Sequence, residues 1–190
     1  KLLSEMSEIT PRDMMEMQAD NYNLKAFESL PIMLAMIDST ALNPVEQNAY
    51  SLLKQWNYEY EINSLGASYY DAWWKAIFSL VWDEIKSSTV PLDYPSDYNT
   101  IRLIKEKPDL SFFDIIDTPE KESAQEVVQL AFKKSVEAIE TWKSEKGKAP
   151  QWADYKDTFI GHLLQGIPAL SYHVEHGGTG DAINATSRTH

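Results

Sequence analysis

The sequence predicts a mainly α-helical fold with a short β element near the C-terminus. Helix-start signals recur along the chain, and apolar residues follow them at helical spacing. A segment after residue 165 instead alternates apolar and polar residues, as a β-strand does. We therefore expect a helical region over residues 1–165 and the start of a β element over residues 166–190.

The first helix is expected to begin at Thr10-Pro11. Thr10 suits the N-cap, Pro11 suits the first helical position, and Asp13 places an acid in the positively polarised first turn. Apolar residues then recur at close to helical period over residues 14–34. Because Pro31 lies inside this pattern and has no backbone N–H, we expect a kink or break there.

Two further helix starts follow. Asn43-Pro44-Val45-Glu46 has the spacing of a capping box, and Asn63-Ser64 offers another N-cap. The segment after Ser64 carries large apolar side chains on one face, which predicts a long, aromatic, largely buried helix. These side chains belong to Tyr69, Trp73, Ile77 and Leu80.

The chain becomes irregular from Ser87 to Pro95, where serine and proline cluster. A short helix around residues 101–104 is expected next, ending before Pro108. Thr118-Pro119-Glu120 repeats the Thr-Pro start, so we expect a long helix from there to Gly147, a residue that suits the position just past a helix end. Its apolar stripe consists of Val128, Phe132, Val136, Ile139 and Trp142.

The strand-like segment covers residues 170–175, where Leu170, Tyr172 and Val174 alternate with polar residues. No partner strand is evident in the sequence, and a lone strand cannot satisfy its backbone polar groups. We therefore expect the chain to be part of a larger structure. The glycine-rich residues 177–181 are expected to form a turn or loop.

Composition excludes several function classes. The chain has 29 acidic and 17 basic residues and a net charge of −12, so phosphate backbones and anionic lipids are repelled, and we expect neither nucleic acid nor membrane as a partner. No cysteine is present, which excludes disulfides, thiolate zinc sites and a cysteine nucleophile. No stretch reaches the roughly 18 uninterrupted apolar residues of a membrane helix.

Two clusters near the C-terminus could carry chemistry. His173, Glu175 and His176, with His162, could supply metal ligands; the alternative is a set of polar residues on an exposed strand, since a metal needs three or four converging ligands. Residues 177–180 could suggest a phosphate-binding loop, but the Lys-Ser/Thr ending of a P-loop is missing, and a tight turn that needs positive φ is favoured.

Three other groups have a structural interpretation that outweighs a functional one. The tryptophans Trp73, Trp74 and Trp82 could form a stacking platform, yet aromatic residues at helical spacing are more often core. Glu120 and Glu122 could imitate a glycosidase carboxylate pair, but surface helices carry such pairs routinely. No hydroxyl has a neighbouring base that would make it a nucleophile, including those of Ser171, Ser187 and Thr10. We therefore assign no catalytic, cofactor-binding or metal residue in this chain.

Several stretches together resemble the penicillin amidase family. Residues 17–31 are similar to the helix that follows the family's active-site segments, and residues 52–73 to its Trp-Asp element and Ser-x-x-x-x-x-Tyr helix. Residues 152–163 resemble a Trp-containing turn and a His-(Pro)-Leu step, and residues 177–185 the loop Gly-Gly-x-Gly-Asp-Thr-Val-Asn-Ala. The departures are Asn57 in place of Asp, Ala182 in place of Thr, and Leu164 near a usual Pro.

The resemblance implies an N-terminal-nucleophile amidohydrolase with a four-layer αββα sandwich, of which this chain is the C-terminal part of the β subunit. The family's nucleophilic serine, oxyanion-hole asparagine and structural calcium ligands would lie upstream, so the fragment alone is expected to be inactive and to hold no cofactor. The implied partners are the α subunit, the N-terminal part of the β subunit and a small-molecule amide substrate.

By the same resemblance the enzyme would be periplasmic or secreted.

Two alternatives remain open at the level of the sequence. The first is an independent helical module that binds a protein partner through its aromatic surface. The second is a small helical metalloenzyme that uses His162, His173 and His176.

Overall fold

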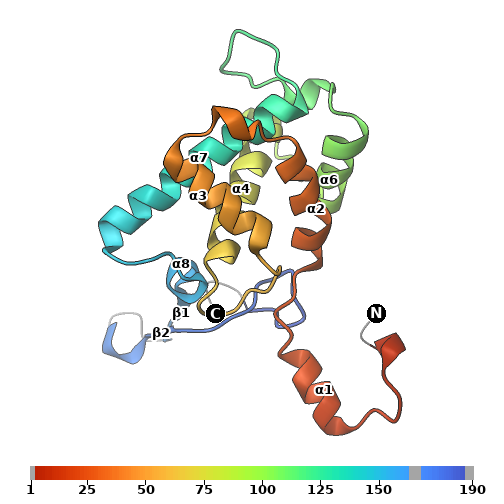
Figure 1. The fold of residues 1–190 in the computed structure, drawn as a ribbon, viewed down its shortest axis with the longest axis vertical. Helices are drawn as coiled ribbons and strands as arrows, with labels where there is room; N and C mark the ends of the chain where they lie inside the picture. The colour runs from red at the N-terminus through yellow and green to blue at the C-terminus, as the bar shows by residue number, and fades with distance from the viewer. Residues whose placement is uncertain (1–2, 163–167, 187–190) are drawn as a thin grey trace.

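A long central helix organises the structure, a computed structural model that describes residues 3–162 and 168–186. This helix, α4 (Leu65–Val81), crosses the middle of the molecule and packs along α7 (Ala124–Lys146), while α3 (Pro44–Gln55) lies over it and α2 (Leu24–Ala35) stands to one side (Figure 1). The fold is mainly α, as the sequence predicts. The remaining helices are α1 (Pro11–Gln18), α5 (Asp83–Ser87), α6 (Asp97–Glu106) and α8 (Trp152–Lys156), with 3-10 turns at Leu3–Glu5, Ser39–Ala41, Ser111–Phe113 and Pro168–Leu170.

The core lies where α4 meets α7. The Trp73 indole is fully buried; its Nε1 donates a 3.0 Å hydrogen bond to the carbonyl of Val128, and its ring lies 4.9 Å from that of Phe132. This arrangement removes a large aromatic surface from water and satisfies the indole N–H at the same time. The apolar stripes predicted for these two helices are confirmed.

The predicted helix starts at Thr10, Asn43 and Ser64 are confirmed. Each of these side chains accepts a backbone N–H from the first turn of α1, α3 or α4, and at Thr10 and Asn43 the acid three residues later completes a capping box. Gly147 follows α7 at φ 67°, a left-handed conformation typical of the residue just past a helix end.

Of the kink or break expected at Pro31, the break is wrong, because α2 runs through this residue. Pro31 removes the hydrogen bond that would reach the carbonyl of Phe27, but both residues lie on the exposed side of the helix, where water can reach that carbonyl. The chain breaks earlier, between α1 and α2, where Asn23 caps α2 through a 2.8 Å bond from the Ala26 N–H.

The expected start of α7 at Thr118 is also wrong. The helix begins at Ala124, where Ser123 and Glu126 form a capping box. Thr118 instead donates its hydroxyl proton to the carbonyl of Ile115 at 2.8 Å, and Glu122 accepts the Ile115 N–H at 3.0 Å. These bonds hold residues 115–122 in a turn, so the Thr-Pro signal caps no helix.

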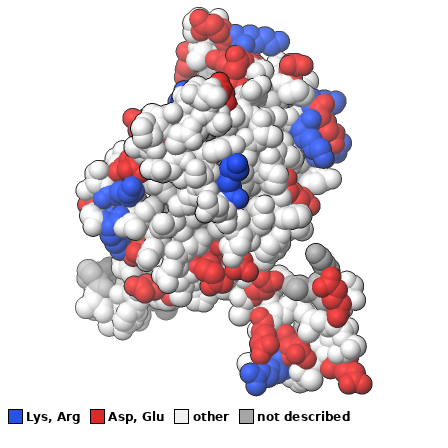
Figure 2. Space-filling view, viewed as in Figure 1, with Lys and Arg blue, Asp and Glu red and all other residues white. Residues whose placement is uncertain are grey.

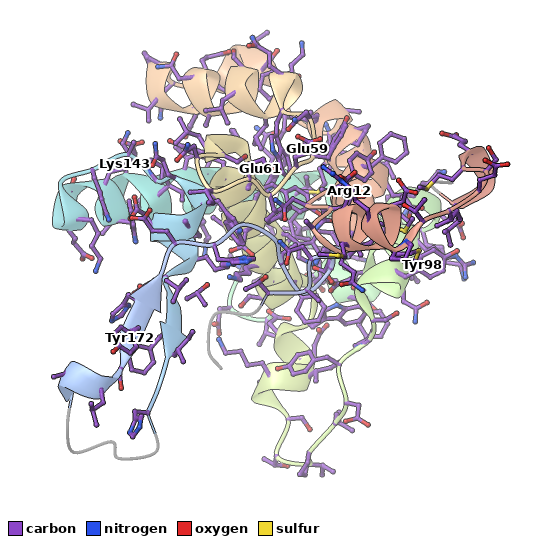
Figure 3. The ribbon with its side chains drawn as sticks, turned by 90° about the horizontal axis from the view of Figure 1, so that it is seen from below. Arg12, Glu59, Glu61, Tyr98, Lys143 and Tyr172 are labelled. Carbon is purple, nitrogen blue, oxygen red and sulfur yellow. The ribbon has the colours of Figure 1, made fainter. Side chains whose placement is uncertain are left out.

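The strand near the C-terminus has a partner within the chain, contrary to expectation. β2 (Tyr172–Val174) pairs antiparallel with β1 (Thr158–Ile160), with Thr158 opposite Val174 and Ile160 opposite Tyr172. The ribbon projects from the helices beside α8 (Figure 1), and Figure 3 shows Tyr172 on it. The absence of a partner strand, which favoured a larger structure, is therefore wrong. The domain boundary expected at residue 165 lies outside the described residues.

Surface charge is unevenly distributed between the helical body and the segment that carries α1. The face formed by α2 and α3 is mostly uncharged, whereas acidic side chains gather at its lower edge and on the segment that carries α1 (Figure 2). That segment stands away from the helical body (Figure 1), and α1 has no buried residue. No helix in the described residues is long and apolar enough to span a membrane.

Candidate functional site

The glycine-rich loop after β2 is held against the underside of the helices. Gly177 and Gly178 are buried, and the Gly178 N–H donates a 2.8 Å bond to the carbonyl of Tyr60. The Trp152 indole and the Lys156 ammonium of α8 donate to the Gly178 carbonyl at 2.8 and 3.3 Å, and Lys156 also donates to the Gly177 carbonyl at 3.0 Å. Figure 3 shows the loop passing beside the segment that carries Glu61.

Close approach of neighbouring groups explains the two glycines. Gly178 has φ +75°, and a Cβ atom there would overlap the carbonyl oxygen of Asn184. A Cβ at Gly177 would lie 2.8 Å from the Asn21 amide nitrogen and 2.9 Å from the Tyr60 oxygen. The predicted turn with positive φ is confirmed at Gly178. The backbone of the turn packs against the segments that carry Asn21, Tyr60 and Trp152.

Lys156 is an unusual cation because it is only 4% exposed. Its ammonium lies 5.8 Å from the centre of the Trp152 ring, and burial lowers the pKa of this amine to about 8. The sequence gives no signal for this residue, since a lysine in the last turn of a short helix is normally solvated.

A second set of polar contacts joins the loop to distant parts of the chain. Asn184 donates from Nδ2 to the Asn21 side chain at 2.8 Å, and Asn21 donates to Glu61 at 2.9 Å. Lys25 of α2 pairs with Asp181 at 2.6 Å and with Asp97 at 2.7 Å. The loop is thereby connected to α2 and to the start of α6.

The structure does not bring His162, His173 and His176 together as ligands of one metal. His173 contacts the Asp157 carboxylate at 2.6 Å, with both side chains more than half exposed, while His176 contacts the Gly177 carbonyl at 2.8 Å. The backbone N–H of His162 donates to Ser171 at 3.1 Å. Across residues 3–162 and 168–186, no group of three or more His, Asp or Glu side chains is placed to hold a metal.

The hydroxyl of Thr186, which sequence analysis did not single out, lies near the imidazole of His176. The Thr186 Oγ1 is 3.2 Å from the Nδ1 of His176. That nitrogen also contacts the Gly177 carbonyl, which only accepts, so Nδ1 must carry the proton and cannot take one from Thr186. Of the hydroxyls considered from sequence, Thr10 caps α1, Ser171 accepts a backbone N–H, and Ser187 lies outside the described residues.

The other candidates take the structural roles that were favoured. Trp73, Trp74 and Trp82 are all buried in the core. Hydrogen bonding with Thr118 and with the Ile115 N–H lowers the pKa of Glu122, the opposite of what a general acid at neutral pH needs.

An open groove lies between α4 and the segment that leads to α6. Its volume is about 380 Å³, and Trp74, Phe78, Trp82 and Tyr94 line it together with Lys75 and Lys86. We call it the aromatic groove. Four aromatic side chains line it, and no sequence motif marks it because its residues come from separate segments.

Comparison with known proteins gives one family. Residues 1–190, the whole chain, match the family model described as penicillin amidase. No curated protein matches the chain.

Proposed function

The chain belongs to the penicillin amidase family, and from this premise we propose that it forms the helical part of an amidohydrolase that cleaves the amide bond of an acylated small molecule. The observation that carries the proposal is the family match over residues 1–190. The described geometry supports a structural role, because the hydroxyls of Thr10 and Ser123, which donate to the carboxylates of Asp13 and Glu126, do so as parts of helix caps.

The proposed reaction is acyl transfer to an N-terminal serine that precedes these residues. The α-amino group of that serine would take the hydroxyl proton as the oxygen attacks the amide carbonyl, and the protonated amine would leave. Water would then hydrolyse the ester and release a carboxylic acid. Hydrogen-bond donors from the same upstream part would stabilise the tetrahedral intermediates.

The present chain would contribute packing to this enzyme. Its proposed partners are the α subunit and the N-terminal part of the β subunit, which would also hold any structural calcium, and the proposed compartment is the periplasm or the exterior. The glycine-rich loop supports this role. Its backbone carbonyls accept hydrogen bonds from Lys156 of α8, and Asp181 pairs with Lys25 of α2, which also pairs with Asp97 of α6.

A panel of chromogenic acyl-anilides tests the proposal. Hydrolysis would be measured for residues 1–190 alone and for the longer gene product that contains them, and activity is expected only in the longer protein. Activity in residues 1–190 that disappears in a Thr186→Val variant would identify Thr186 as a nucleophile and overturn the proposal. Silence in both proteins would favour the alternative of a helical interaction module.

A further inference from the structure

We propose that Asp83 and Glu84 share one proton and thereby form an acid-stabilised latch between α5 and residues 111–118. Asp83 and Glu84 are the first two residues of α5, which follows α4 after Trp82. Residues 111–118 lie in the connection between α6 and α7. The latch is independent of the proposed amidohydrolase activity, because it uses only residues of this chain and needs no substrate.

Each carboxylate of the pair has one buried oxygen that lacks a donor. Within the described residues, Asp83 Oδ1 and Glu84 Oε2 are shielded from water and accept no hydrogen bond. Such an oxygen is destabilising because it has lost its water and gained no partner. A proton on Glu84 relieves this for both groups, since its O–H can donate to the Asp83 carboxylate.

The nearest acids favour the protonated form of Glu84. Burial raises the pKa of its carboxyl above 4.5, and the negative charges of Asp83 and Asp114 raise it further. A hydrogen bond from its own backbone N–H acts in the opposite direction and does not cancel them. Glu84 is therefore the member of the pair that takes the proton, because Asp83 already accepts the N–H of Ile116.

Other charged groups border Asp83 at an open cavity of about 480 Å³ between α4, α5, α7 and residues 115–118. They are Lys86, Asp117 and Lys134, and all three side chains are exposed. Because water screens exposed charges strongly, the two lysines compensate the partly buried acids only weakly. The same cavity would widen if residues 115–118 moved away from α5.

Asp83 also connects α5 to the segment 111–118. Its Oδ2 accepts the Ile116 N–H at 3.0 Å. Beside this bond, the Phe112 ring packs 5.2 Å from the ring of Trp82, the residue that precedes α5. The hydrogen bond and the ring contact together hold the segment against the start of α5.

Ionisation of Glu84 is expected to open this connection. Two negative charges on α5 then face Asp114 on the segment, and their repulsion weakens the contact. The folded chain binds the proton more tightly than the unfolded one, because the pKa of Glu84 is raised above 4.5 only in the folded state. The stabilisation is therefore fully present below about pH 4.5 and is lost as pH rises through the folded pKa.

Carboxyl titration and amide exchange in residues 1–190 test the two parts of the proposal separately. With ¹³C-labelled glutamate side chains, the NMR signal of Glu84 is assigned by its loss in Glu84→Gln and is expected to titrate with a midpoint above 4.5. Asp83→Asn is expected to move this midpoint toward 4.5, because one negative neighbour is removed. A midpoint at or below 4.5, or one that Asp83→Asn leaves unchanged, would refute proton sharing.

Hydrogen exchange of the Ile116 amide, corrected for the intrinsic effect of pH, reports opening of the latch. Its protection is expected to fall across the titration of Glu84, as pH rises from about 4.5 to about 7.5. Protection should stay constant in Glu84→Gln, because glutamine is uncharged and keeps an N–H donor for Asp83. Glu137→Gln removes an exposed carboxylate on α7 and should behave as wild type. Protection that does not follow the titration of Glu84, or that falls equally in Glu84→Gln, would overturn the latch.

Discussion

Gly178 adopts a backbone conformation that side chains rarely tolerate, and its neighbours leave no room for one. We predict that Gly178→Ala lowers the free energy of unfolding by about 2–4 kcal/mol, from left-handed strain and displacement of the Asn184 carbonyl. Gly180→Ala, where nothing lies within 4 Å, should change it by less than about 0.5 kcal/mol. Urea denaturation of both variants measures the two changes in unfolding free energy. Equal changes would mean that the neighbours of Gly178 do not restrict this position.

Lys156 should make stability depend on pH in the alkaline range. Burial lowers the pKa of its amine to about 8 from 10.5, so between these values the unfolded chain binds more protons than the folded one. Stability contributed at this site therefore rises as pH increases from about 8 toward 10.5. Tyr60 acts in the opposite direction above about pH 10, because burial raises its pKa well above 10.0 and the unfolded chain loses that proton first.

A Lys156→Met variant isolates the lysine effect. Methionine keeps the apolar stem and has no titrating group. The unfolding free energy of wild type minus that of the variant should therefore increase as pH rises from about 8 to 10. Tyr60 and the other groups titrate alike in both proteins and cancel. Parallel stability curves over this range would contradict an amine pKa near 8.

Pro31 lies in the interior of α2 and interrupts its backbone hydrogen bonding on an exposed face. We predict that Pro31→Ala stabilises the protein by about 1–3 kcal/mol, because the new N–H can bond to Phe27 and the helix loses a poor former. Pro119→Ala, in the turn before α7, should instead destabilise by about 0.4–1 kcal/mol, since it frees the unfolded chain. Thermal unfolding compares the two, and the same sign in both would contradict a continuous α2.

Helix starts were predictable from sequence where a cap uses only neighbouring residues. Thr10, Asn43 and Ser64 each bond to an N–H within three positions, and that signal is complete in the local sequence. Thr118 carried the same pattern, but Glu122 formed a competing bond to Ile115 that spacing rules did not include. Local sequence signals thus predict that a helix is present, and competing hydrogen bonds shift the residue at which it begins.

Non-local contacts account for the rest. The partner of β2 was missed because β1 has three residues, begins two positions after the end of α8, and gains its hydrogen bonds only by pairing with residues 12 to 16 positions away. The glycine turn was predicted, yet its partners Lys156, Tyr60 and Asn21 were not, since they meet only after α8 and the α3–α4 connection are placed. The aromatic groove was missed for the same reason.

The two ends of the described chain differ in how they attach to the helical body. At the N-terminal end, α1 has no buried residue and stands apart in Figure 1. At the other end, the loop from Gly177 to Asn184 accepts hydrogen bonds from Lys156 and Trp152. Asn184 donates to the Asn21 side chain, and Asp181 pairs with Lys25. Cooperative unfolding should therefore include the C-terminal loop and exclude α1.

Paired truncations test this asymmetry. Removing residues 1–18 should change the free energy of unfolding by less than about 0.5 kcal/mol, because none of residues 3–18 is buried. Removing residues 177–190 should lower it by about 2–4 kcal/mol, because the Trp152 indole and the Lys156 ammonium lose their carbonyl acceptors and Tyr60 loses its cover. Urea midpoints of the two truncated chains measure the difference. A larger loss from the first truncation would show that α1 docks on the body, and the loop would then be an appendage instead of part of the folded unit.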